Sequence, residues 1–304
     1  MFDLAIIGGG PAGVAAGVYA ARKRLKTLLI TESFGGQSTD SMGIENWIGF
    51  KSVSGPDFGK LLEDHLRFYA GDSVEIKLDK VNKLNKLDKE FEIQTENGQT
   101  YLSKTILITT GSMRKKLEIP GAKEFDNKGI SYCASCDGPL FAGQDVVVVG
   151  GGNAAFETAA QLLSYAKSVT LLNRSDSFKA DEMTVEKVLS NPKMKAIKNA
   201  MPKKVKGDKF VNSLVYEEGG AEKELSVTGI FVEIGLIPST GFVKDLISFN
   251  KIGQIPVDPK TQKTAVPGVW AAGDSTDGLY HQNNIAAGDA VKALEDIYLD
   301  LHTK

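Results

Sequence analysis

Apolar and polar residues follow the same strand-turn-helix order in two separate parts of the chain. Residues 4–7 form a short apolar run typical of a buried strand, and the Ala-rich stretch 14–21 that follows has helical character. The same order recurs at 146–149 and 156–165. The pattern predicts an α/β protein built from two Rossmann-like dinucleotide-binding domains.

A glycine-rich turn joins the predicted strand to the helix in each part. The turns are Gly8-Gly9-Gly10-Pro11-Ala12-Gly13 and Gly150-Gly151-Gly152-Asn153-Ala154-Ala155. The first glycine of such a turn allows a sharp bend, the second lets backbone approach a pyrophosphate, and the third position packs helix on strand. The candidate cofactor-binding residues here are Gly8, Gly10, Pro11, Ala12, Gly13, Gly150, Gly152, Asn153, Ala154 and Ala155.

The residue that ends the next predicted strand differs between the two parts. Glu32 follows Gly13 by nineteen residues, and Arg174 follows Ala155 by nineteen residues. A carboxylate at this place accepts hydrogen bonds from a ribose diol, whereas an arginine pairs with a 2′-phosphate. We expect two different dinucleotides. The alternative is two doubly wound domains whose charges at these positions are incidental.

Only two cysteines occur in the 304 residues, and they lie between the two glycine turns. Cys133 and Cys136 have the spacing of a redox-active disulfide, and Asp137 is placed to exchange a proton with a thiolate. Half a zinc site and two inert thiols are the alternatives. A zinc site needs two more ligands, and the three histidines are scattered without ligand spacing, so we predict no metal.

The position of the cysteine pair suggests a flavin. The pair lies about ten residues before the strand at 146–149, the first predicted strand of the second dinucleotide-binding unit, and so belongs to the second domain. A two-electron carrier has to connect a nicotinamide to a disulfide, and a flavin accepts hydride and passes electrons to sulfur. We therefore expect FAD on the first domain, with Glu32 at its ribose.

Several further motifs resemble those of the low-molecular-weight thioredoxin reductases and of the C-terminal flavoprotein part of alkyl hydroperoxide reductase. They lie at 35–37, 44–47, 109–111, 133–138 and 268–274. The resemblance implies that Cys136 is the flavin-proximal sulfur and that Cys133 attacks the partner's disulfide. It implies FAD contacts from Gly36, Gln37, Asn46, Gly111, Gly273, Asp274, His281, Gln282 and Asn283. Asn46 as an ordinary turn residue and Gln282 as an ordinary helix-start residue are the alternatives.

The nicotinamide site departs from the family pattern. NADPH-using members carry His-Arg-Arg and then an arginine four residues on, whereas this chain has Asn173-Arg174-Ser175 and then Lys179. Arg174 and Lys179 retain two cations for a 2′-phosphate, although lysine acts as a point charge. His281 stands where the thioredoxin reductases usually have arginine. We favour NADPH; NADH and a ferredoxin-type donor remain alternatives.

The second domain is predicted to be inserted into the first. Residues 1–114 and 244–304 form the FAD-binding domain, and residues 115–243 form the NAD(P)H-binding domain that carries the dithiol. Within the insert, 210–216 and 224–230 are predicted to pair as a hairpin. Because dithiol and nicotinamide have to reach one flavin in turn, we expect the insert to rotate on its two connections.

Composition narrows the classes of function. The chain has 36 basic and 38 acidic residues, a net charge of −2, which argues against a nucleic-acid binder. Its apolar runs are strand-sized, so we expect no membrane span and a cytoplasmic location. With no second dithiol, its electrons are expected to leave to thioredoxin or a thioredoxin-like protein. A glutaredoxin-like or peroxiredoxin shuttle, an electron carrier and a redox-sensing module are the alternatives, and the resemblance implies a homodimer.

Overall fold

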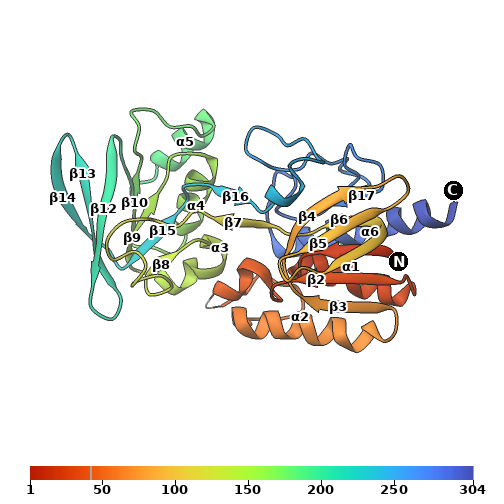
Figure 1. Cartoon of the computed structure of the whole chain (residues 1–304). Coiled ribbons are helices and arrows are strands. Elements are labelled where there is room, and N and C mark those ends of the chain that lie inside the picture. The colour runs from red at the N-terminus through yellow and green to blue at the C-terminus, as the bar shows by residue number, and fades with distance from the viewer. Residues whose placement is uncertain (42, 304) are drawn as a thin grey trace. The chain divides into compact units, whose positions relative to one another are not determined.

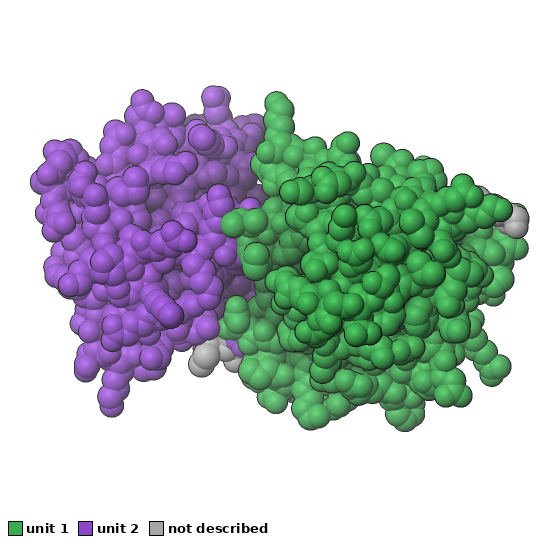
Figure 2. All heavy atoms as spheres, viewed as in Figure 1, with its two compact units in different colours: residues 1–40, 47–113, 237–304 green, residues 41–46, 114–236 purple. Residues whose placement is uncertain are grey.

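The computed structural model describes residues 1–41 and 43–303, which divide into two compact units. Unit 1 comprises Met1–Asp40, Trp47–Met113 and Ile237–Lys304, and unit 2 comprises Ser41–Asn46 and Arg114–Leu236 (Figure 2). The chain passes from unit 1 to unit 2 in β7 (Ser112–Arg114) and returns in β16 (Leu236–Pro238), and these two strands pair with each other. The return lies at residue 237, earlier than the predicted 244, because β16 is one of the two connections.

A seven-stranded sheet forms the centre of unit 1 (Figure 1). Its order is β3-β2-β1-β6-β5-β4, and β17 also pairs with β6. The strands are β1 (Phe2–Ile7), β2 (Thr27–Thr31), β3 (Val74–Leu78), β4 (Val81–Lys86), β5 (Phe91–Thr95), β6 (Thr100–Ile108) and β17 (Val269–Ala271). Strands β1, β2, β3, β6 and β17 run parallel, so their carboxyl ends meet at one edge. Such an edge is where doubly wound folds bind their ligands.

In its described residues, unit 1 has the α-helices α1 (Pro11–Arg22), α2 (Gly55–Ala70) and α6 (Asn283–Thr303). Helix α1 contacts both of the others. A Cβ on Gly17 would lie 2.8 Å from Leu66 Cδ1, so the absence of a side chain lets α1 and α2 pack closely. The buried strand residues Leu4, Ile6 and Leu29 complete the core around α1. Two 3₁₀ turns, η1 (Gly36–Asp40) and η3 (Gly241–Val243), lie in the connecting segments.

Unit 2 contains a second sheet, of five parallel strands in the order β11-β10-β9-β15-β8. The strands are β8 (Ile130–Ser131), β9 (Asp145–Val149), β10 (Ser168–Leu172), β11 (Met194–Ile197) and β15 (Gly229–Val232). Its helical elements are α3 (Ala134–Asp137), η2 (Gly138–Phe141), α4 (Asn153–Leu162) and α5 (Glu182–Leu189). Residues 146–149 are almost fully buried because β9 is the central strand.

A three-stranded antiparallel sheet, β12 (Ala200–Gly207), β13 (Val211–Glu218) and β14 (Ala221–Ser226), completes unit 2. The predicted hairpin is present, with Gly219 and Gly220 at its turn, both at positive φ. Its second strand ends at Ser226, however, and not at residue 230. Gly229–Val232 is a separate, fully buried strand of the parallel sheet, which explains its apolar sequence.

Candidate active site

The first glycine turn lies at the carboxyl end of β1. Gly8 has a φ of +118°, in the region that favours glycine. A Cβ on Gly13 would lie 1.9 Å from Gly8 O, so only glycine lets α1 approach the turn this closely. A Cβ on Gly10 would meet nothing nearer than Gly36 Cα, at 4.0 Å. Backbone at the start of α1 is therefore open to a ligand, as a pyrophosphate site requires.

The residues that follow β6 and β17 in unit 1 also lie next to this turn. Thr109 follows β6, and its hydroxyl donates to Gly8 O at 3.1 Å. Gly273 follows β17, and a Cβ there would lie 3.2 Å from Ala286 and 3.4 Å from Ala12. The structure thus brings the predicted residues of the first turn and of the segment after β17 to one edge of the sheet.

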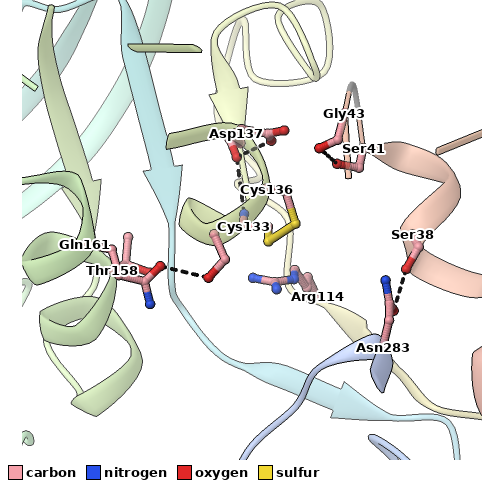
Figure 3. Close-up of a disulfide and its surroundings, with 12 residues drawn as sticks. Ser38, Ser41, Gly43, Arg114, Cys133, Cys136, Asp137, Thr158, Gln161 and Asn283 are labelled. Carbon is pink, nitrogen blue, oxygen red and sulfur yellow. Dashed lines mark hydrogen bonds between the residues drawn. A yellow bond between two sulfur atoms is a disulfide. The ribbon is translucent and has the colours of Figure 1, made fainter. Parts of the chain in front are cut away.

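Predicted residues of η1 and α6 are held by side-chain hydrogen bonds. Gln37 Nε2 donates to the backbone carbonyl of Ser112 and, at 3.3 Å, to its hydroxyl. Asn283 Oδ1 accepts from Ser38 Oγ at 2.8 Å (Figure 3). His281 Nδ1 lies 3.4 Å from Asp274 Oδ1. These contacts connect η1, the segment after β6 and the start of α6 within unit 1.

Glu32 directly follows β2 at the same edge. Its exposed carboxylate lies 3.5 Å from Lys80 Nζ, and the same ammonium lies 3.5 Å from Glu96. The carboxylate therefore retains acceptor capacity for a ribose diol, which is the role that the sequence predicts. Asn46 differs from the other predicted flavin contacts, because the segment that contains it groups with unit 2.

The second glycine turn lies at the carboxyl end of β9. Gly150 has a φ of +151°, and a Cβ on Gly151 would lie 2.1 Å from Asn173 Oδ1. A Cβ on Gly152 would meet nothing within 4 Å, so its backbone is open. Lys179 N donates to Gly151 O at 2.8 Å, which ties the segment after β10 to the turn.

Two asparagine side chains of this region form hydrogen bonds with backbone, and of these Asn153 is a predicted site residue. Asn153 Oδ1 accepts from Asp181 N at 2.8 Å, so its side chain fixes the start of α5. The buried Asn173 side chain donates to the carbonyls of Ser175 and Ser177 at 3.0 and 2.8 Å. The asparagine that replaces the family's histidine thus shapes the loop that presents Arg174, and Arg174 itself is exposed.

Cys133 and Cys136 form a disulfide, with their Cα atoms 5.3 Å apart (Figure 3). Cys133 occupies the N-cap position of α3, and both cysteines are half-buried. Ser135, between them, donates from Oγ to Gln161 Oε1 on α4 at 2.8 Å. The two sulfurs are thus bonded to each other, in keeping with the interpretation of this pair as a redox disulfide. Across the described residues, no group of three or more potential ligand side chains is placed to hold a metal.

Asp137 follows the disulfide and is held by a residue that the sequence did not single out. Its Oδ2 accepts from Ser131 Oγ at 2.6 Å. Its Oδ1 is buried. Burial raises the pKa of the Asp137 carboxyl, and hydrogen bonds from Ser131 and Ser41 and the charge of Arg114 oppose that rise. A carboxyl with a raised pKa keeps its proton to higher pH than an ordinary aspartic acid, which favours a role in proton transfer.

A second buried carboxyl of unit 2 was also missed. Glu233 follows β15, and its Oε1 accepts from Thr158 Oγ1 at 2.8 Å and lies 3.6 Å from Arg114 Nη1. Burial raises the pKa of Glu233, and the Arg114 charge and the Thr158 hydrogen bond oppose the rise. Its only sequence signal was its place directly after an apolar run.

A model of one protein family matches residues 2–290, described as pyridine nucleotide-disulphide oxidoreductase. The chain belongs to the pyridine nucleotide-disulphide oxidoreductase family. The predicted family resemblance and the fold of two dinucleotide-binding domains are thereby confirmed. Members of this oxidoreductase family combine a flavin with a pyridine nucleotide. In the helices that the structure describes, no segment is both long and apolar enough to cross a membrane.

The relatives of this chain carry different names. The chain is 42% identical over 294 residues to a protein of Bacillus subtilis (strain 168) named NADH dehydrogenase. It is 39% identical over 296 residues to an alkyl hydroperoxide reductase subunit of Pseudomonas aeruginosa. Each match covers 96% of this chain but 57% of the relative, so the chain spans a little over half the length of these curated relatives.

One solved structure matches this chain from end to end. The crystal structure of thioredoxin reductase from Streptococcus pyogenes MGAS5005 matches with a TM-score of 0.90 and 34% identity. The match covers 100% of this chain and 99% of that one.

The two glycine turns fit the two cofactors that the oxidoreductase family implies. In each turn, one glycine has a positive φ, a second leaves no room for a Cβ, and Gly10 or Gly152 leaves backbone uncovered at a helix N-terminus. Such a cradle suits a pyrophosphate, since a Cβ at the open position would occupy the ligand's place. Glu32 in unit 1 and Arg174 in unit 2 directly follow β2 and β10, the strand position at which dinucleotide-binding folds contact a ribose.

Proposed function

We propose that this protein is an FAD-dependent disulfide reductase that transfers electrons from NADPH, through the Cys133–Cys136 disulfide, to a thioredoxin-like protein. The observation that carries the proposal is that disulfide, next to a half-buried acid, on a unit with its own dinucleotide cradle. Similarity to the thioredoxin reductase of S. pyogenes supports the substrate class. The FAD cradle is Gly8–Gly13 with Glu32, and the NADPH cradle is Gly150–Ala155 with Arg174 and Lys179.

The remaining flavin contacts are proposed on the same basis. They are Gly36, Gln37, Asn46, Gly111, Gly273, Asp274, His281, Gln282 and Asn283. The chemistry that FAD supplies when bound is acceptance of a hydride from reduced nicotinamide and delivery of an electron pair to a disulfide. Because the cysteines belong to unit 2 and the flavin cradle to unit 1, we propose that unit 2 rotates on its connections during turnover.

The cysteines carry out two exchange steps on the partner. Reduction breaks the Cys133–Cys136 bond and leaves a dithiol after uptake of two protons. Cys133 thiolate then attacks the partner's disulfide, which forms a mixed disulfide and releases one partner thiolate. Cys136 attacks Cys133 Sγ, restores the internal disulfide and releases the second partner thiolate. Asp137 holds a proton on its carboxyl and exchanges it with the departing or attacking sulfur.

NADH is the second candidate donor. The B. subtilis relative named NADH dehydrogenase supports it, as does Asp176, an exposed acid two residues after Arg174. A carboxylate near the adenine-side ribose favours a free diol over a phosphate. The acceptor of that alternative is a peroxiredoxin-type or glutaredoxin-like protein, in keeping with the relative named for alkyl hydroperoxide reductase.

An anaerobic titration tests donor and cofactor together. The purified flavoprotein is mixed with NADPH, NADH or reduced ferredoxin, and the flavin absorbance is followed in each case. We expect rapid bleaching by NADPH, slower or weaker bleaching by NADH, and recovery of the oxidised spectrum when oxidised thioredoxin is added. Bleaching by NADH alone transfers the proposal to the NADH donor, and bleaching by neither nucleotide contradicts it.

A further inference from the structure

A third cation lies beside the loop that presents Arg174. Lys198 directly follows β11, the strand that pairs in parallel with β10, so both residues stand at the same edge of the sheet. Backbone hydrogen bonds join the two segments, from Asn173 N to Ile197 O at 2.9 Å and from Asn199 N to Ser175 O at 3.1 Å.

The ammonium group of Lys198 is positioned by an aromatic side chain. Its Nζ lies 4.8 Å from the centroid of the Phe178 ring, and Phe178 packs edge-on against the fully buried Phe156 of α4. Phe178 lies between Arg174 and Lys179 in the same loop. A cation over an aromatic face keeps its remaining donors available to a ligand, since the ring satisfies only one side of it.

The charges of this group are not neutralised within the unit. Arg174, Lys179 and Lys198 are all exposed, and none forms an ion pair among the residues that the structure describes. Two acids, Asp176 and Asp181, lie in the segment between β10 and α5, and the carboxylate of Asp181 accepts from Thr184 N at the start of α5. Three cations against these two carboxylates still leave a net positive site, directly beside the open glycine turn that Lys179 contacts through its backbone.

We propose that Lys198 is a specificity-determining residue that binds the 2′-phosphate of NADPH together with Arg174 and Lys179. The inference rests on the proposed function. Lys198 replaces the second arginine of the family pattern, since its neighbour Asn199 is hydrogen-bonded to Ser175, the residue at that arginine's position. Lys198, more than twenty residues after Arg174 in the sequence, thus supplies the third cationic side chain that the family pattern places within the loop.

Calorimetric binding to the intact flavoprotein tests this without turnover. Adenosine 2′,5′-bisphosphate and 5′-AMP differ only in the 2′-phosphate and are titrated into wild type, Lys198→Met, Lys198→Arg and Lys195→Met. Lys198→Met keeps an apolar stem over Phe178 but removes the charge. Lys195→Met is the matched control, because it removes an exposed lysine from within the same strand.

We expect Lys198→Met to weaken binding of the bisphosphate about tenfold and to leave 5′-AMP binding unchanged. Lys198→Arg should bind within about twofold to threefold of wild type, and Lys195→Met should match wild type. The inference about Lys198 is overturned if Lys198→Met and Lys195→Met bind the bisphosphate equally, or if Lys198→Met loses as much affinity for 5′-AMP as for the bisphosphate. Either result leaves the proposed function untouched. A wild type that binds both ligands equally contradicts the NADPH preference itself, and the role of Lys198 with it.

Discussion

Ser131 donates a hydrogen bond from its hydroxyl to Asp137 Oδ2 across 2.6 Å, and its Oγ accepts from Cys133 N at 3.2 Å. One buried hydroxyl therefore connects the backbone of the first cysteine to the acid that follows the second. The bond stabilises the ionised form of Asp137, whereas burial favours the protonated form and dominates. A hydrogen bond from Ser41 and the charge of Arg114 act in the same direction as Ser131. The availability of a proton beside the disulfide depends on the balance between burial and these three groups.

Replacing Asp137 by asparagine should slow turnover of a protein disulfide by about 10²-fold or more, the usual contribution of a general acid–base group. Flavin reduction by the nicotinamide should be unchanged in a single-turnover measurement. In wild type, the step that needs protonated Asp137 should slow as pH rises through the raised pKa. The Asp137→Asn protein should lose that pH dependence.

Ser131→Ala serves as the companion variant for this prediction. It removes the bond that stabilises the carboxylate, so the pKa of Asp137 should rise further and the midpoint of the pH profile should move to higher pH. A midpoint that moves to lower pH, or an Asp137→Asn profile identical to that of wild type, would show that another group supplies the proton.

Glu233→Gln should change how stability depends on pH. Burial raises the pKa of Glu233 above its unfolded value, so its contribution to folding is full below the unfolded pKa and is lost as pH rises through the folded pKa. Glutamine does not titrate. The free energy of unfolding of Glu233→Gln, relative to wild type, should therefore increase as pH rises from about 4 toward neutrality.

Urea denaturation at several pH values measures this difference. Glu222→Gln, at an exposed position on β14, is the matched control for the loss of one acidic side chain. If the difference between Glu233→Gln and wild type stays constant or shrinks with rising pH, the ion pair with Arg114 outweighs burial and the assignment is wrong.

Two glycines of the first turn should respond differently to alanine. Gly13→Ala places a Cβ 1.9 Å from Gly8 O, and the overpacking should lower the free energy of unfolding by about 1–3 kcal/mol. Gly10→Ala adds a methyl group to open space, so the fold should remain intact while affinity for FAD falls. Thermal unfolding and flavin retention on gel filtration separate the two effects. Gly10→Ala with wild-type flavin content would contradict the proposed pyrophosphate site.

The glycine turns and the residues at the strand ends could be predicted because they depend on short sequence spacings. The turn at Gly150 and the position of Arg174 follow from the strand-turn-helix order of a single βαβ unit. The hairpin around Gly219 was predictable for the same local reason, whereas the end of its second strand was not. The apolar run at 229–232 is equally typical of an antiparallel and of a parallel strand. Only its pairing with β9 shows that it belongs to the parallel sheet.

The residues that the sequence did not reveal have partners on a neighbouring strand or on another secondary-structure element. Lys198 reaches the Arg174 loop because β10 and β11 pair in parallel, and nothing in the local pattern around it distinguishes it from neighbouring lysines. Ser131 and Glu233 are ordinary polar residues at strand ends until burial and their partners on α3 and α4 are known. Such roles depend on tertiary contacts between residues far apart in the chain, and no short sequence spacing predicts them.

The measurement that tests the central claim most directly is steady-state oxidation of the nicotinamide with oxidised thioredoxin as acceptor. It compares wild type with Cys133→Ser, Cys136→Ser and, as a matched control inside the same motif, Ser135→Ala. We predict one NADPH consumed per thioredoxin disulfide reduced by wild type and Ser135→Ala. Both cysteine variants should show only background turnover, although NADPH still bleaches their flavin. Undiminished turnover in either cysteine variant, or a wild type whose reduced flavin leaves thioredoxin oxidised, would contradict the account.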